Sequence, residues 1–172
     1  MTSESLYIGS VEVQSAAAEL GAVMPALVSS LEPVTRTRLL QVNTDASLAQ
    51  VAALLANAQI GLVVVCDAAG AIVGTITETI LVRQLGFGKA DIFTTQAGQV
   101  MARDYTVCAP SDSIAEVLTV MHARGLVHVP VADTHNKALG VLNARDGLRA
   151  LLASGTYEEA LLRNYVMGVG YQ

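Results

Sequence analysis

The chain has 172 residues, enough for one domain with a sizeable core or for two small domains. Its residues are 52% apolar, which argues against disorder, and its net charge is −5. That charge argues against broad binding to nucleic-acid phosphates, which requires clustered Lys and Arg. Residues 46–66 carry no charged side chain, but polar side chains interrupt the run and its pattern changes from helical to strand. We therefore expect a buried helix and strand there, with no membrane insertion.

The N-terminal region carries no targeting signal that we recognise. Its first basic residue is Arg36, so the positively charged start of a signal peptide is missing. Cys66 and Cys108 occupy strand-like positions and are expected to be buried, reduced thiols of a cytoplasmic protein. Residues 1–33 form a separate segment whose apolar residues recur at roughly helical spacing, which predicts a helical segment packed on the main body.

Residues 34–86 contain a complete series of predicted elements. A short strand (38–42) precedes a helix that begins at residues 45–47, where Ser47 and Gln50 have the spacing of a capping box. An apolar strand (62–65), a turn (67–70) and a second strand (71–76) follow. A closing helix (79–85) ends at Gly86.

Residues 98–152 repeat this series after a polar linker. A shift of 66 residues without a gap superposes Ser47 on Ser113, Val65 on Val131, and Gly74 on Gly140. The second copy again has a predicted capping box (Ser113 with Glu116), a β-hairpin with its turn at residues 133–136, and a final helix (145–152). An ungapped match over helix, strand, turn and strand predicts an internal duplication of a β-α-β-β-α unit.

Asn143 and Asp146 fall where the last strand of the second unit leads into its last helix. Helix N-termini present free N–H groups to anions, so these side chains are placed to meet a ligand. Both residues also suit a purely structural role, Asn143 as a helix cap and Asp146 as a first-turn acid favoured by the helix dipole.

In order, the second unit contains Val100-Met101, Ser113, Val129-Pro130-Val131, and Gly140 to Asp146 with Asn143 at a Ser/Thr position. In this pattern the unit resembles the cystathionine β-synthase (CBS) domain, over about residues 35–152. The resemblance implies a non-catalytic α+β tandem pair with pseudo-twofold symmetry and two clefts between the units. It also implies a homodimer, and clefts that bind adenosine-containing ligands such as AMP, ADP, ATP or S-adenosylmethionine.

The resemblance assigns roles to particular side chains. Val107, Val129 and Pro130 would supply a flat apolar slot for adenine, and Pro130, lacking an N–H group, suits a strand edge. Asp146 matches the family's Asp and would accept two hydrogen bonds from the ribose diol.

Three other residues are candidates for contact with the phosphate end of a ligand. Asn143 takes the family's Ser/Thr position, and His128 falls where the family often has an Arg. If His128 touches phosphate, binding should weaken as the pH rises past the imidazole pKa; the alternative is a partly exposed strand residue. Arg145 is expected on the solvated face of the last helix, with phosphate contact as the alternative. His122 and His135 have no matching Cys or carboxylate cluster, so no metal site is expected.

The first unit departs from the pattern. Gly74 and Thr77 are in place, but Ile80 takes the ribose position and Val64 replaces the proline. Because isoleucine cannot accept hydrogen bonds from hydroxyls, an unpaired diol there would cost about 1–3 kcal/mol per group. The sequence therefore predicts one competent site per chain, built around Asp146.

We expect a regulatory module, not an enzyme, that binds an adenosine nucleotide as a regulatory ligand, requires no cofactor, and signals to an unknown partner protein. The alternative is a structural dimerisation or scaffold module with vestigial clefts. Residues 153–172 predict a tail helix with an apolar stripe, which packs against its own chain or dimer mate or docks a partner.

Overall fold

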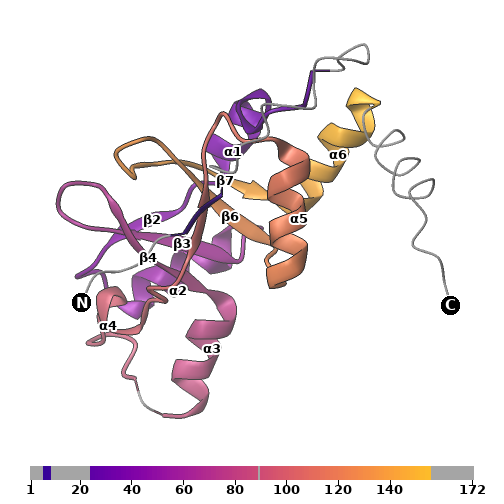
Figure 1. The fold of residues 1–172 in the computed structure, drawn as a ribbon. Helices are drawn as coiled ribbons and strands as arrows, with labels where there is room; N and C mark the ends of the chain where they lie inside the picture. The colour runs from indigo at the N-terminus through magenta and orange to yellow at the C-terminus, as the bar shows by residue number, and fades with distance from the viewer. Residues whose placement is uncertain (1–5, 9–23, 89, 156–172) are drawn as a thin grey trace, which may run out of the picture.

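The computed structural model describes residues 6–8, 24–88 and 90–155, and Figure 1 shows how its helices and strands are arranged. From residue 156 onward the predicted tail helix lies outside the described residues, and so does most of the predicted N-terminal segment. The described part of that segment contains β1 (Leu6–Ile8), the 3-10 helix η1 (Val28–Leu31) and the start of α1 (Glu32–Thr37). No helix among these residues is long and apolar enough to cross a bilayer.

The first unit contains β2 (Gln41–Asn43), α2 (Leu48–Asn57), β3 (Leu62–Cys66), β4 (Ile72–Thr77) and α3 (Glu78–Gly86). Its sheet has the order β2-β3-β4, with β2 parallel and β4 antiparallel to β3. The predicted capping box of α2 is confirmed, because Gln50 N donates to Ser47 Oγ (3.3 Å) and Ser47 N donates to Gln50 Oε1 (2.9 Å).

The second unit contains α4 (Ala97–Val100), β5 (Thr106–Cys108), α5 (Ile114–Arg124), β6 (His128–Ala132), β7 (Ala138–Asn143) and α6 (Ala144–Ser154). Its sheet has the order β1-β5-β6-β7, since β1 adds a fourth strand parallel to β5. The predicted α+β fold built from two β-α-β-β-α units is therefore confirmed.

The predicted capping box at Ser113 is wrong, because the Ser113 side chain makes no cap hydrogen bond. The segment before η1 lies against the start of α5 instead. Ile114 N donates to Ala26 O (2.9 Å), and Leu27 forms an antiparallel bridge with Ser113. The backbone of residues 26–28 thus satisfies a helix-start N–H group that a side chain would otherwise cap.

The hairpin turns of the two units have the same hydrogen bonds. Asp133 Oδ1 accepts from His135 N (2.8 Å) and Lys137 N (2.9 Å), and Asp67 Oδ1 accepts from the equivalent backbone groups, both at 2.9 Å. The turns also meet, since Ala71 forms an antiparallel bridge with Lys137, which is its equivalent 66 residues later. A contact between equivalent residues marks the pseudo-twofold axis.

The units exchange the segments that precede them. A Cβ atom built on Gly74 would lie 2.5 Å from Met101 Sδ, and one built on Gly140 would lie 2.7 Å from the backbone carbon of Thr35. Thr35 and Met101 are themselves 66 residues apart. Each repeated glycine therefore leaves room for the segment that leads into the other unit.

The core has three clusters of buried residues. One is centred on each unit and includes residues of the segment that leads into the other unit, Ala97 and Met101 in the first and Val28 in the second. The third joins the two sheets, with Leu62 and Val64 from β3 and Val107 and Val141 from the second unit. This third cluster packs the two units against each other.

Candidate functional site

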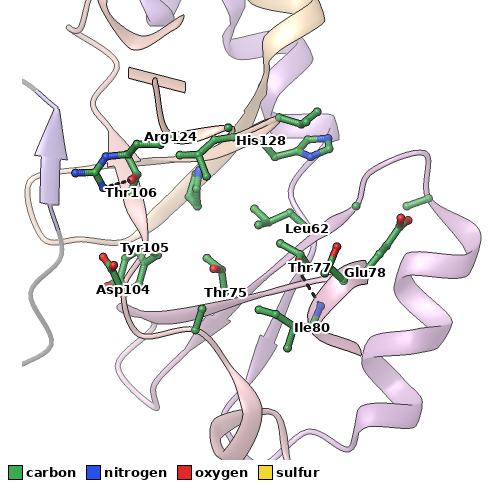
Figure 2. Close-up of a pocket in the computed structure, with 18 of the residues that line it drawn as sticks. Leu62, Thr75, Thr77, Glu78, Ile80, Asp104, Tyr105, Thr106, Arg124 and His128 are labelled. Carbon is green, nitrogen blue, oxygen red and sulfur yellow. Dashed lines mark hydrogen bonds between the residues drawn. The ribbon is translucent and has the colours of Figure 1, made fainter. Parts of the chain in front are cut away.

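A cavity of about 1000 Å³ lies between the two units (Figure 2). The first unit contributes residues from the segment after α2 and from β3, β4 and α3. The second unit contributes the segment before β5 and the start of β5, the end of α5 with the turn after it, and the start of β6. Polar and charged members of its lining include Thr75, Thr77, Glu78, Asp104, Thr106, Arg124 and His128. Its volume is at the upper end of the range for small-molecule sites.

One end of the cavity lies at the start of α3. Thr77 caps this helix, and its Oγ1 accepts a hydrogen bond from Ile80 N (3.3 Å). Glu78 is exposed, whereas Ile80 is half-buried and packs partly on the core of the first unit. This end therefore offers the hydroxyl of Thr77, the carboxylate of Glu78 and the apolar side chain of Ile80. The carboxylate expected at position 80 for ribose binding is missing.

The other end lies where α5 stops. Arg124 is the last residue of α5 and donates from its guanidinium to Thr106 Oγ1 (3.1 Å). Asp104 is exposed and lies two residues before Thr106. Tyr105, between them, is buried and donates from its hydroxyl to Ile72 O (2.8 Å), which fixes this segment on the first unit. Figure 2 shows Arg124, Thr106 and Asp104 at one end, and His128 and Glu78 at the other.

His128 lies at the edge of the cavity and contacts Asn143, with 2.9 Å between His128 Nε2 and Asn143 Nδ2. Because an amide nitrogen only donates, Nε2 accepts this hydrogen bond and is unprotonated. Burial lowers the pKa of His128 below 6.5, and the nearby Arg38 charge lowers it further, against the opposing effects of Glu78 and Asp146. The imidazole is therefore neutral at neutral pH.

Asp146 is buried and paired with Arg38, which precedes β2 of the first unit. Arg38 Nε lies 2.5 Å from Asp146 Oδ2, and Arg38 Nη2 donates to Asp146 Oδ1 at 3.1 Å. The guanidinium thus engages both carboxylate oxygens in the geometry that Arg favours for carboxylates. The residues 66 positions away from this pair are Asp104 and Ile80, so the twofold-related place is an open cavity without an ion pair.

The structure brings together only some of the seven predicted ligand-binding residues. His128 and Pro130 line the cavity. Val107 and Val129 are fully buried in two different core clusters. Asn143 caps α6, with Arg145 N donating to its Oδ1 (2.8 Å), and Arg145 itself is exposed. Asp146 is bound to Arg38 and is not among the described residues that line the cavity.

The pseudo-twofold axis explains this division. In the sequence, Pro130 and Asp146 belong to the same unit, and we expected them to share a cleft. In the structure, Pro130 and His128 line the cavity together with Thr77 and Ile80 of the first unit, whereas Asp146 is paired with Arg38 at the start of the first unit. Each cleft therefore combines residues of both units.

Sequence reasoning missed four charged residues: Arg38, Glu78, Asp104 and Arg124. A signal for two of them was present, because Arg38 and Asp104 are equivalent positions with opposite charges. The opposite charges can be interpreted only when it is known that Arg38 pairs with Asp146 and that Asp104 lies at the cavity. Within the described parts of the chain, no group of three or more His, Cys, Asp or Glu side chains could hold a metal ion.

Comparison with solved structures finds CBS-domain proteins. The CBS-domain containing protein ATU1752 from Agrobacterium tumefaciens is 25% identical, with a TM-score of 0.63 over 82% of this chain and 98% of that one. The CBS domain pair of protein MJ0100, solved in complex with 5-methylthioadenosine and S-adenosyl-L-methionine, is 20% identical. Its TM-score is 0.64 over 77% of this chain and 99% of that one.

A sequence relative comes from Acidianus ambivalens. It is a 17.7 kDa protein of the bps2 3′ region and is 24% identical over 144 residues, which are 84% of this chain and 86% of the relative. Residues 28–86 and 97–153 both match the family description "CBS domain". These two matches cover more than half of the chain and coincide with the two units of the fold. The chain therefore belongs to the CBS-domain family, as a tandem pair.

Proposed function

We propose that this chain is a regulatory module that binds one adenosine-containing ligand in the cavity between its units and signals the occupancy to a partner protein. The cavity supports this proposal most directly, because it has about 1000 Å³ and takes its walls from both units. The solved complex of MJ0100 with two adenosine compounds supports the same ligand class.

The cavity offers suitable contacts for each part of adenosine. Leu62 and Pro130 provide apolar surface for a flat ring, and Pro130 lacks an N–H group that would need a partner. The start of α3, capped by Thr77, presents backbone donors to the sugar. Ile80 leaves the ribose diol without a carboxylate at that position, so we expect moderate affinity.

A ligand that touches both units favours one arrangement of them over others, and the partner would read that arrangement. The partner is a protein still to be identified, and we further propose that the module acts as a homodimer. Both cysteines are buried and free, which supports a reducing, cytoplasmic compartment.

The predicted ribose-binding role of Asp146 requires that its ion pair with Arg38 be broken. Arg38 engages the carboxylate that would accept the diol, so a second ligand would have to displace the guanidinium. Calorimetric titration of Arg38→Ala with methylthioadenosine tests this role. We expect one ligand per wild-type chain, and two per variant chain if the freed Asp146 carboxylate binds a second ligand.

The second candidate function is a structural dimerisation or scaffold module whose clefts are vestigial. The Arg38–Asp146 pair favours it, because the Asp146 carboxylate is already bound by a side chain of the same protein. Thermal unfolding with AMP, ADP, ATP, methylthioadenosine and S-adenosylmethionine separates the two functions. A ligand at 100 times its Kd should add about 2.7 kcal/mol of stability, and no shift with any compound would favour the scaffold.

A substitution locates the site. Ile80→Asp restores a carboxylate at the ribose position and should strengthen methylthioadenosine binding by about tenfold, since a hydrogen bond to a charged group contributes about 1.5–3 kcal/mol. Val82→Asp is the matched control, because Val82 lies on the same helix, is 66% exposed and does not line the cavity. Unchanged affinity in Ile80→Asp would argue against this cavity as the site.

A further inference from the structure

The charges of the cavity differ from those that a polyphosphate requires. Glu78 and Asp104 contribute two carboxylates, and Arg124 is the sole arginine or lysine among the described residues that line it. The neutral imidazole of His128 adds no positive charge. The lining is therefore acidic overall, and several phosphate charges would meet net repulsion.

Arg124 and Asp104 lie at the same end of the cavity, away from α3 (Figure 2). Arg124 is held there by its hydrogen bond to Thr106 Oγ1 (3.1 Å), and Asp104 precedes Thr106 by two residues. No partner of the Asp104 carboxylate is found within the described part of the chain. This end therefore offers a cationic donor group and an anionic acceptor group to the same ligand.

The combination of Arg124 and Asp104 occurs in this cleft and is not repeated at the equivalent positions of the first unit. The equivalent positions in the first unit are Arg38, which is bound to Asp146, and Ala58, which carries no polar side-chain atom. The duplication therefore does not account for the pair, and its two charges are features of the open cavity alone.

We propose that Arg124 and Asp104 determine ligand specificity by recognising an α-amino-acid group attached to the 5′ end of the adenosine. This inference rests on the proposed function and narrows its ligand class to S-adenosylmethionine-type compounds over AMP, ADP and ATP. The ligand's carboxylate pairs with the Arg124 guanidinium, and its ammonium group pairs with Asp104.

The opposite charges of the amino-acid group match the opposite charges of the two side chains, whereas a phosphate chain could match Arg124 only. A phosphate chain would also face Asp104, and placing like charges together is an effective means of rejecting a competing ligand. The sulfonium of S-adenosylmethionine adds a positive charge inside an acidic cavity, which favours it further.

Calorimetric titration of the full chain at one ionic strength tests the inference with methylthioadenosine, S-adenosylmethionine, S-adenosylhomocysteine, AMP and ATP. Methylthioadenosine carries neither an amino-acid group nor a phosphate and reports adenosine binding alone. We expect both amino-acid ligands to bind about tenfold more tightly than methylthioadenosine, and ATP to bind more weakly than it.

Arg124→Met and Asp104→Asn should each reduce S-adenosylmethionine affinity by about tenfold and change methylthioadenosine affinity by less than about twofold. Arg124→Lys should have an intermediate effect, because it keeps the charge without the planar fork. Arg149→Met is the control, since Arg149 is exposed on α6 and lies outside the cavity lining.

The outcomes separate the two proposals. Equal affinities for methylthioadenosine and S-adenosylmethionine, tightest binding of ATP, or equal losses for both ligands in Arg124→Met would overturn the specificity role and leave adenosine binding in place. Binding of none of the five compounds would overturn both the specificity role and the proposed function.

Discussion

Arg38 and Asp146 are 108 residues apart in the chain and form an ion pair that joins the start of the first unit to the last helix of the second. Their side chains are 27% and 9% exposed, respectively. A pair so shielded from water depends on both partners, because either charge alone would remain buried without compensation. The pair therefore fixes the arrangement of the units on one side of the pseudo-twofold axis, and the open cavity occupies the other side.

Arg38→Met should lower the free energy of unfolding by about 3 kcal/mol, because the Asp146 carboxylate would be left without its cation. Urea denaturation followed by circular dichroism measures the change. The double variant Arg38→Met/Asp146→Leu should recover most of the loss, since apolar side chains of similar size can replace a buried pair.

Arg36→Met provides the control for this ion pair. Arg36 contacts Glu32 at 3.5 Å, but both side chains are more than half exposed, so we expect a change below about 1 kcal/mol. Equal losses in Arg36→Met and Arg38→Met would show that the buried pair has no special role.

His128 predicts a pH-dependent stability. Its pKa is lowered below 6.5 in the folded chain by burial and by the charge of Arg38, so the unfolded chain binds more protons around that pH. The contribution of His128 is therefore fully present above pH 6.5 and declines as the pH falls through 6.5, until the folded-state pKa is passed.

His128→Gln should flatten this decline in urea denaturation curves recorded between pH 7.5 and about pH 5. His122→Gln is the control, because His122 is exposed on α5. The neutral state of His128 also limits the phosphate-binding role suggested by the sequence, which requires a charged imidazole. A slope in His128→Gln identical to that of the wild type would contradict the assignment.

Gly140 predicts a steric effect. A Cβ atom at this position would lie 2.7 Å from the Thr35 backbone carbon and 2.8 Å from its oxygen. Gly140→Ala should therefore lower the free energy of unfolding by about 1–3 kcal/mol, as overpacking does. At Gly86 a Cβ atom would meet open space, so Gly86→Ala should be neutral or stabilising by up to about 1 kcal/mol. Equal effects of the two substitutions would refute the close approach of Thr35.

The two helix-opening serines should differ despite their equivalence in sequence. Ser47→Ala removes the capping box of α2 and should lower the free energy of unfolding by about 1 kcal/mol. Ser113 makes no cap hydrogen bond, so Ser113→Ala should change stability by less than half of that amount. Thermal melts of the two variants provide the comparison. A larger loss of stability in Ser113→Ala than in Ser47→Ala would show that Ser113 does cap α5.

Much of the fold could be predicted because its signals are local. The spacing of apolar residues marks α2 and α5, and Asp67 and Asp133 mark the turns through hydrogen bonds to backbone groups two and four residues later. The repeat at 66 residues then implied two similar units. Even here a local signal failed at Ser113, where a distant backbone segment supplies the partner.

The sequence alone determined the repeated unit, its order of elements and the turn residues, since these depend on neighbours a few positions apart. The tertiary structure alone decided which side chains share a cleft, because the pseudo-twofold axis combines residues of both units. It joins Asp146 to Arg38 and leaves their equivalents, Ile80 and Asp104, at an open cavity. No local pattern encodes a contact between residues that are 108 positions apart. The burial of Asp146 and the neutralisation of its charge both depend on that contact.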